Sequence, residues 1–460
     1  MTGYRYETDS LGKVAVKKDA MWGAQTERSR MNFHIGNDLM PEGIIQAYAF
    51  IKEACAIINH KEGKISQIQL DGIRDACVAI RDGKLDQAFP LHVWQTGSGT
   101  QTNMNLNEVI ANYANEKLGY EKGSKHPIHP NDHVNCSQSS NDTFPTAMHI
   151  SFVIGLDKHL SPSLNRLEKI LAHKCEDFKD IIKIGRTHLQ DAVPLTLGQE
   201  FSGYYSQISA HIKDIDNARS SLLSLALGAT AVGTGLNASK TFPEATAEII
   251  AQLTGKAFKS ASNKFQALSA HTEAVKLSSA LKNLAASIYK ISNDIRMLSS
   301  GPRSGFGELI LPKNEPGSSI MPGKVNPTQC EALCMVAIQI MAYDYAVSLA
   351  ASQGQFELNV NKPLIAYNIL HGLHLLGDCI QSFCDHCLEG LRANERVIEK
   401  HVENSLMLIT ALTPEIGYDK SAEIANYAYQ NNTTLREAAK QLGSISLEVF
   451  DQRMHPSNMV

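Results

Sequence analysis

The chain has 460 residues and a mass of 50.4 kDa, more than one hydrophobic core usually serves, so two or three domains are expected. It is 43% hydrophobic and 20% charged with a net charge of −4, which excludes the basic stripe of a nucleic-acid-binding protein. The first residues lack the pattern of a secretory signal, and no apolar stretch looks long enough to span a bilayer. We therefore expect a cytoplasmic protein with no nucleic-acid or membrane partner.

Residues 1–138 mix short helical patterns with polar, turn-rich stretches, and we expect them to form a mainly helical N-terminal domain. A first polar segment, Gln95–Asn105, crowds hydroxyls and amides around Gly97 and Gly99. Glycine lets backbone N–H groups approach a ligand closely, and a nest of such donors suits a carboxylate or a phosphate. Clusters of Ser, Thr and Asn also form ordinary turns and helix caps, so this segment alone does not decide between the two interpretations.

A second polar segment, Ser137–Thr143, leads into an apolar helical pattern. One or two of its residues are expected to cap that helix, but the segment holds more small polar residues than one cap requires. A third, Gly185–Asp191, contains His188, whose imidazole titrates near neutrality and suits proton transfer. A lone histidine is more often structural, and the chain has 17 of them.

Long helices are predicted over most of residues 139–397. Residues 256–300 contain no Gly or Pro, which predicts one helix of roughly 40 residues and about 60 Å. Its apolar residues follow a strict heptad: Leu277, Leu281, Leu284, Ile288, Ile291, Ile295 and Leu298. The ranges 156–182, 328–353 and 364–389 have similar helical patterns, so the four read as a bundle. Helices of this length need neighbours to cover their ends, which favours an oligomer.

The fourth polar segment lies between Pro312 and Pro327, where four of the 16 prolines occur. Its centre, Gly317–Pro327, offers hydroxyls, an ammonium and an amide between glycines. A loop this long in a helical protein is usually functional, for example as an active-site lid.

The nine cysteines predict no metal centre. The one close pair, Cys384 and Cys387, has no second pair at zinc-site spacing, and no group of thiolates stands out to hold an iron–sulfur cluster. We expect these cysteines to act as small hydrophobic residues. Residues 398–460 form a small helical unit, in which Thr434 and Glu437 fit a capping box.

The sequence GSSIMPGKVNP at 317–327 resembles the signature loop of the fumarase/aspartase superfamily, and the other three polar segments match further blocks of it in order. Gly323 and the sequence Thr-Gln-Cys-Glu331 are similar to class II fumarases, because aspartases typically carry alanine at that glycine. The resemblance implies an all-α chain of three domains, 1–138, 139–397 and 398–460, with a central long-helix bundle that forms a tetrameric core. It also implies hydration of fumarate to (S)-malate through an aci-carboxylate, in the tricarboxylic acid cycle and without a cofactor.

The resemblance assigns roles residue by residue. Ser318 is implied as the base, with His188 and Glu331 on the side that handles the proton and activates water. Substrate carboxylates would be bound by Ser98, Gly99, Thr100, Ser139, Ser140, Asn141, Thr187, Ser319, Lys324, Val325 and Asn326. A second dicarboxylate site would use His129, Pro130, Asn131 and Asp132.

Two positions depart from the pattern of the family. His126 stands where many relatives carry arginine, and a neutral imidazole binds anions less well, which implies a weaker second site. Ala229 replaces a common glycine, a change expected to be minor. The alternatives are an aspartate ammonia-lyase, which the sequence after the loop disfavours, and a non-catalytic structural protein, which would have lost catalytic residues. Ser318, His188, Lys324 and Glu331 are all present here.

Overall fold

The computed structural model describes residues 3–460 and is 62% helical, so the predicted all-α fold is confirmed. The chain divides into two compact units, each built from three stretches of sequence. Unit 1 comprises Met1–Pro162, Lys213–Ala285 and Ile338–Gly377, and unit 2 comprises Ser163–Ile212, Ala286–Ala337 and Asp378–Val460. The domain boundaries predicted at residues 138 and 397 stay a prediction.

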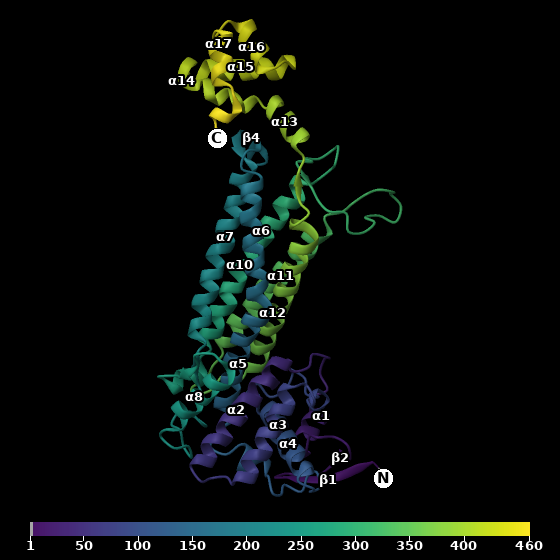
Figure 1. Ribbon diagram of the computed structural model, residues 1–460, viewed down its shortest axis with the longest axis vertical. Helices are drawn as coiled ribbons and strands as arrows, with labels where there is room; N and C mark the ends of the chain where they lie inside the picture. Colours follow the sequence, from purple (N-terminus) through teal and green to yellow (C-terminus); the bar gives the residue numbers. More distant parts are fainter. Residues whose placement is uncertain (1–2) are drawn as a thin grey trace. The chain divides into compact units, whose positions relative to one another are not determined.

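Unit 1 begins with an antiparallel hairpin of two strands, followed by helices that pack around α2 (Figure 1). Its elements are β1 (Tyr4–Asp9), β2 (Gly12–Lys17), α1 (Ala24–Asn32), α2 (Glu42–Lys61), α3 (Gln67–Arg81), α4 (Thr100–Lys117), α5 (Ser140–Gly155), α8 (Phe242–Thr254) and α9 (Lys264–Ser269), with a short parallel pair, β5 (Ser224–Leu225) and β6 (Lys259–Ser260). Helix α2 contacts α3, α5 and α8, and α4 contacts α3 and α5. The rings of Tyr48 in α2 and Phe144 in α5 meet edge to face in this core.

Unit 2 contains the C-terminal helices and two antiparallel strand pairs. Its elements are β3 (Ile182–Thr187), β4 (Gln190–Thr196), β7 (Leu309–Ile310), β8 (Arg392–Ala393), α13 (Glu395–Asn404), α14 (Thr413–Ile416), α15 (Tyr418–Asn431), α16 (Leu435–Leu442) and α17 (Leu447–Arg453). The predicted capping box is confirmed, because Thr434 and Glu437 cap the start of α16 reciprocally. Leu412, Ile424 and Ala438 are fully buried at the centre of this small helical cluster.

The long helices are α6 (Ser161–Asp177), α7 (Leu197–Ser221), α10 (Thr272–Leu298), α11 (Thr328–Ala351) and α12 (Lys362–Phe383). Every residue of the predicted heptad in α10 is buried, with exposures of 0–7%, so the seam is confirmed. The helix predicted over 156–182 continues α5 through a π-helical turn at Leu156–Leu160 into α6, but it ends at Asp177, and Ile182 already belongs to β3. Helix α7 was not among the predicted helices.

The prediction of a single helix over 256–300 is wrong. Lys259 and Ser260 pair with β5 as strand β6, and Asn263 then caps α9 by accepting a hydrogen bond from the Gln266 backbone N–H. Ala270 has extended backbone geometry, so α10 starts only at Thr272 and is about 40 Å long at 1.5 Å per residue. The absence of Gly and Pro permits a helix but does not force one, since strand pairing and an asparagine cap divide the segment.

The expectation that no stretch is long enough to cross a bilayer is also wrong as stated. Helix α11 has 24 residues and an 18-residue window of mean hydropathy 1.6, so its length and composition would suffice. It nevertheless carries Asp344, which accepts a hydrogen bond from Ser278 and pairs with Lys282 at 3.0 Å. One such helix is weak evidence for a membrane span, because core and interface helices have the same composition.

Candidate functional site

The first polar segment forms the entry to α4. Gly99 is the N-cap residue with φ of 78°, a left-handed conformation that favours glycine, and Thr100 is the first helical residue. The hydroxyl oxygens of Ser98 and Thr100 lie 2.9 Å apart. Two hydroxyls at a helix N-terminus suit an anion, although the Thr102 N–H of this first turn already donates to Gln95 Oε1 at 3.1 Å.

The glycines of this segment have a structural reason that the sequence interpretation missed. A Cβ atom on Gly97 would lie 1.3 Å from the Val360 carbonyl oxygen, and one on Gly99 would lie 2.0 Å from the Phe144 ring. Gly97 also accepts a hydrogen bond from the Lys362 N–H at 3.1 Å. Close packing against the protein itself therefore requires both glycines, whatever ligand the segment binds.

The second polar segment forms the start of α5. Ser139 is its N-cap and forms a capping box with Asp142, as expected for one residue of this segment. Asn141 donates its side-chain amide to the Ala231 carbonyl at 2.8 Å, and Ser140 accepts a hydrogen bond from the Asn103 amide at 3.1 Å. The last contact joins the two segments, so the N-termini of α4 and α5 present their polar residues together.

Buried charges lie behind these two helix starts. Lys52 and Lys362 are fully buried and Lys264 is partly buried. Burial lowers the pKa of their ammonium groups to about 7 for Lys52, about 7 for Lys362 and about 8 for Lys264. The Asp142 carboxyl is fully buried, which raises its pKa to about 6, although backbone N–H groups of Thr230, Ser139 and Gly228 stabilise its charged form. Its charge favours the charged form of each lysine. Sequence reasoning missed all three lysines; for Lys52, the signal was its place within an apolar helical run.

The third polar segment is the tip of the β3–β4 hairpin in unit 2, an element that the sequence did not predict. Thr187 pairs with Gln190, so His188 and Leu189 form a two-residue loop, with φ of 56° and 62°. A tight hairpin turn of this kind normally uses Asn-Gly, and a leucine with positive φ is unusual. The exposed His188 therefore lies in a tight turn whose strain falls mainly on Leu189, and backbone strain of this kind is a feature of functional positions.

A buried ion network supports the base of this hairpin. Glu308 is fully buried and pairs with Lys183 at 3.3 Å, with Arg186, and with His401 at 3.0 Å. Lys183 also pairs with Glu200 at the start of α7. Burial acts to raise the pKa of Glu308, but the hydrogen bond from Arg186 and the charge of Lys183 hold that pKa below its ordinary value.

The fourth segment is an exposed loop in unit 2 that leads into α11. Its ends are tied by hydrogen bonds from the Gly317 N–H to the Lys324 carbonyl at 2.9 Å and from the Asn326 amide to the Gly317 carbonyl. The Ser318 hydroxyl oxygen accepts hydrogen bonds from the backbone N–H groups of Ile320 at 3.3 Å and Met321 at 3.0 Å. Two donors aimed at one serine oxygen would stabilise negative charge on it.

The predicted site residues are divided between the two compact units. The segments at 98–100 and 139–141 belong to unit 1, whereas those at 187–188 and 317–331 belong to unit 2. Within residues 3–460, no hydrogen bond or ion pair joins His188 to Glu331, or His188 to Ser318. Ser319, Lys324, Val325 and Glu331 are exposed.

The stretch predicted as a second dicarboxylate site forms a π-helical turn, Pro130–Val134. His129 caps it, because its Nδ1 atom accepts hydrogen bonds from the N–H groups of Asn131 and Asp132, both at 3.1 Å. Burial lowers the pKa of His129, so it is mainly neutral at pH 7. The imidazole lone pair is thus committed to the turn and does not offer a positive charge to an anion.

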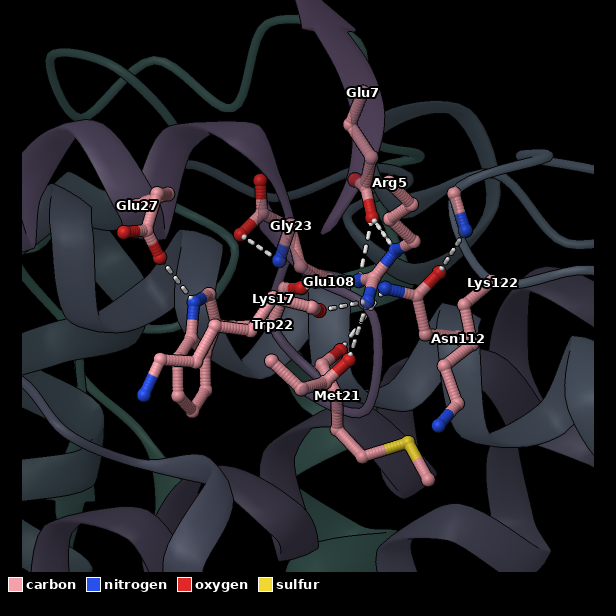
Figure 2. Close-up of polar contacts among 12 residues, drawn as sticks. Arg5, Glu7, Lys17, Met21, Trp22, Gly23, Glu27, Glu108, Asn112 and Lys122 are labelled. Atoms are coloured by element: carbon pink, nitrogen blue, oxygen red, sulfur yellow. Dashed lines mark hydrogen bonds and ion pairs between the residues drawn. The ribbon is translucent and has the colours of Figure 1, made fainter. Parts of the chain in front are cut away.

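A cavity of about 290 Å³ adjoins this turn and is lined in part by Asn131. Its wall carries the carboxyl groups of Glu7, Asp9 and Glu108 against one cation, Lys125. Figure 2 shows how two of these acids are used: Arg5 contacts Glu7, and Glu108 accepts a hydrogen bond from the Gly23 N–H. Glu7 pairs with Arg5 at 2.6 Å and Asp9 pairs with Arg28 at 2.7 Å, so two of the three acids are balanced by arginines. The second dicarboxylate site stays a prediction.

The cysteines are free, and Cys384 and Cys387 are among the six that are buried. Burial raises the pKa of Cys384 to about 12, which keeps its thiol protonated. Across the described part of the chain, residues 3–460, no three His, Cys, Asp or Glu side chains come together in a way that could hold a metal ion.

Comparison with known proteins finds relatives along the whole chain. A family model described as "Lyase" matches residues 12–342, and one described as "Fumarase C C-terminus" matches residues 408–460. "Fumarate hydratase class II" of Thermosynechococcus vestitus is 58% identical over 451 residues, covering 98% of this chain and 97% of the relative. The protein of the same name from Bacillus cereus is 54% identical over 457 residues and covers 99% of both chains. A crystal structure of recombinant class II fumarase from Schistosoma mansoni matches with a TM-score of 0.97 at 47% identity, over 99% of both chains.

Proposed function

The chain belongs to the lyase family of class II fumarate hydratases, and from this premise we propose that it interconverts fumarate and (S)-malate by adding or removing water. The observation that carries the proposal furthest is the Ser318 oxygen with its two backbone N–H donors, in a loop that matches the signature of the family. The reaction belongs to the tricarboxylic acid cycle.

Ser318 is the proposed base that removes the C3 proton of malate. A serine hydroxyl is a weak base, so it must be deprotonated and its alkoxide stabilised before it can act. The N–H groups of Ile320 and Met321 already point at the oxygen, at 3.3 and 3.0 Å, and Lys324 lies in the same loop. The two donors support Ser318 over the neighbouring Ser319, for which no such pair of donors occurs among residues 3–460.

The C2 hydroxyl of malate leaves as water in the same direction of reaction, and His188 is the proposed group that supplies its proton, with Glu331 as its partner. Removing a proton next to a carboxylate creates an aci-carboxylate with additional negative charge. Uncharged donors at the α4 and α5 helix starts, together with Thr187, Asn326 and the Lys324 ammonium, would stabilise that charge. The proposal therefore assigns no step to a cofactor.

We further propose a homotetramer in which each site draws residues from several subunits. Ile338, Tyr345 and Leu349 on α11 are 56%, 73% and 52% exposed and follow heptad spacing. An apolar stripe of this kind on a long helix is typical of a surface that packs against another helix. We retain the cytoplasm as the proposed location, because free cysteines suit a reducing compartment.

The hydratase function is tested by following the absorbance of fumarate as the purified protein dehydrates malate. An aspartate ammonia-lyase would instead release ammonia from aspartate, and a structural protein would do neither. We expect activity with malate and none with aspartate; ammonia release without malate dehydration would overturn the proposal.

The shared site is tested by complementation between two inactive proteins, His188→Asn and Ser318→Ala. If the two residues of one site come from different subunits, co-expression gives some tetramers in which one site has both residues intact, and partial activity returns. Mixed tetramers that are verified by two different affinity tags, yet are as inactive as either parent, would rule out this arrangement.

A further inference from the structure

Lys52 in α2 is fully buried, and its ammonium is satisfied only by neutral groups. Its Nζ atom donates to the side-chain oxygens of Asn103 at 2.7 Å, Asn135 at 3.1 Å and Gln138 at 2.8 Å. An ammonium has three donors, so these three amide oxygens use all of them. A buried charge is costly, and one held only by neutral amides deserves a functional explanation beyond stability.

The ammonium determines how the Asn103 side chain is oriented. A lysine ammonium can only donate, so the amide oxygen of Asn103 must face it and the amide NH₂ must face away. That NH₂ group donates to Ser140 Oγ at 3.1 Å and to Asn135 Oδ1 at 3.0 Å. Ser140 therefore accepts a hydrogen bond from inside the protein, and its own hydroxyl hydrogen is left to donate.

The charge of Lys52 is also not cancelled by a hydrogen-bonded carboxylate. The nearby acid is Asp142, and its two oxygens accept hydrogen bonds from the backbone N–H groups of Ser139, Gly228 and Thr230 at 2.8–3.0 Å. Lys52 and Asp142 thus interact as opposite charges without a direct hydrogen bond, and the influence of Lys52 on Ser140 runs through Asn103.

We propose that Lys52 is a positioning residue for substrate binding: through Asn103 it makes Ser140 a hydrogen-bond donor to a substrate carboxylate. This role of Lys52 rests on the proposed function in one respect, because it takes a C4 dicarboxylate as the ligand. The chain of contacts Lys52–Asn103–Ser140 predicts that removing the ammonium acts through Ser140 and weakens binding more than it slows the chemical step.

The test is a double-mutant cycle with Lys52→Met and Ser140→Ala, measured both by malate kinetics and by calorimetric binding of succinate, a non-reacting C4 dicarboxylate. We expect Lys52→Met to raise the KM for malate and the Kd for succinate about tenfold while kcat changes less than threefold. When Ser140 is already alanine, Lys52→Met should change the KM for malate and the Kd for succinate less than twofold. Lys174→Met is the matched control, since Lys174 is also buried but donates to the Leu391 carbonyl, and should leave KM unchanged.

Asn103→Asp provides a second route if Lys52→Met does not fold. The new carboxylate keeps a partner for Lys52 but cannot donate to Ser140, so KM and Kd should rise as they do in Lys52→Met. Full additivity in the cycle, or a normal succinate Kd in Asn103→Asp, would overturn the role of Lys52. Wild-type protein that binds succinate but does not dehydrate malate would instead overturn the proposed function and leave the binding cycle to decide on Lys52.

Discussion

Gly97→Ala separates the two reasons for a glycine in the first polar segment. The added Cβ would lie 1.3 Å from the Val360 oxygen and 2.3 Å from its carbonyl carbon, both backbone atoms that no side-chain rotation can move. An ordinary contact begins near 3.4 Å, so the two backbones must separate by about 2 Å. The hydrogen bond from the Lys362 N–H to the Gly97 carbonyl then breaks. We expect the free energy of unfolding to fall by about 1–3 kcal/mol because of overpacking and by about 1 kcal/mol because of the lost hydrogen bond.

The same displacement moves Ser98 and Thr100, which follow directly in the chain. A misplacement of about 1 Å in a substrate-positioning group can cost about 100-fold in rate, so kcat/KM for malate should fall at least 100-fold. Malate dehydration gives the rate, and a thermal unfolding scan gives the accompanying fall in melting temperature. Gly203→Ala is the control: Gly203 lies inside α7 with nothing within 4 Å of the added Cβ, so activity should be unchanged. A Gly97→Ala protein with parental melting temperature and kcat/KM would refute the packing argument.

Three further results are expected. Ser318→Ala should lower kcat by several orders of magnitude with little change in succinate affinity, and near-normal turnover would remove Ser318 from the base role. Neither a chelator nor exposure to air should abolish activity; loss that is restored by added iron or zinc would contradict this. Glu308→Gln should lower the free energy of unfolding by about 3–5 kcal/mol, because it leaves the buried Lys183 and the partly buried Arg186 without their shared carboxylate. Glu415→Gln, in the exposed pair with Arg453, is the control and should lower it by under about 1 kcal/mol. Since the folded-state pKa of Glu308 lies below its ordinary value of 4.5, its contribution is present above pH 4.5 and is lost as pH falls through the folded pKa. The difference in melting temperature between parent and Glu308→Gln should therefore shrink in acid, and a difference that grows would show the sign to be wrong.

Much of the helical architecture was predictable from local pattern. The heptad from Leu277 to Leu298 could be read directly, because burial along one helix face repeats at a fixed spacing that neighbours in sequence reveal. The capping box at Thr434 was predictable for the same reason, since all of its atoms lie within four residues. The four polar segments were found from their composition and from their resemblance to a family. Both depend only on the identity and order of the residues.

Tertiary structure decided what depends on residues far apart in the sequence. Gly97 needs to be glycine because Val360, more than 250 residues later, approaches its backbone, and no local pattern signals such an approach. Lys52 lies within an ordinary helical pattern. Only the fold brings it into hydrogen-bonding contact with Asn103, which in turn donates to Ser140. The strand pair that shortened the helix predicted at 256–300 is likewise a contact between distant segments. Sequence alone therefore determined the features that local pattern encodes, such as the heptad of α10, the capping box of α16 and the four polar segments. Long-range packing determined where helices end and which buried groups orient the polar residues.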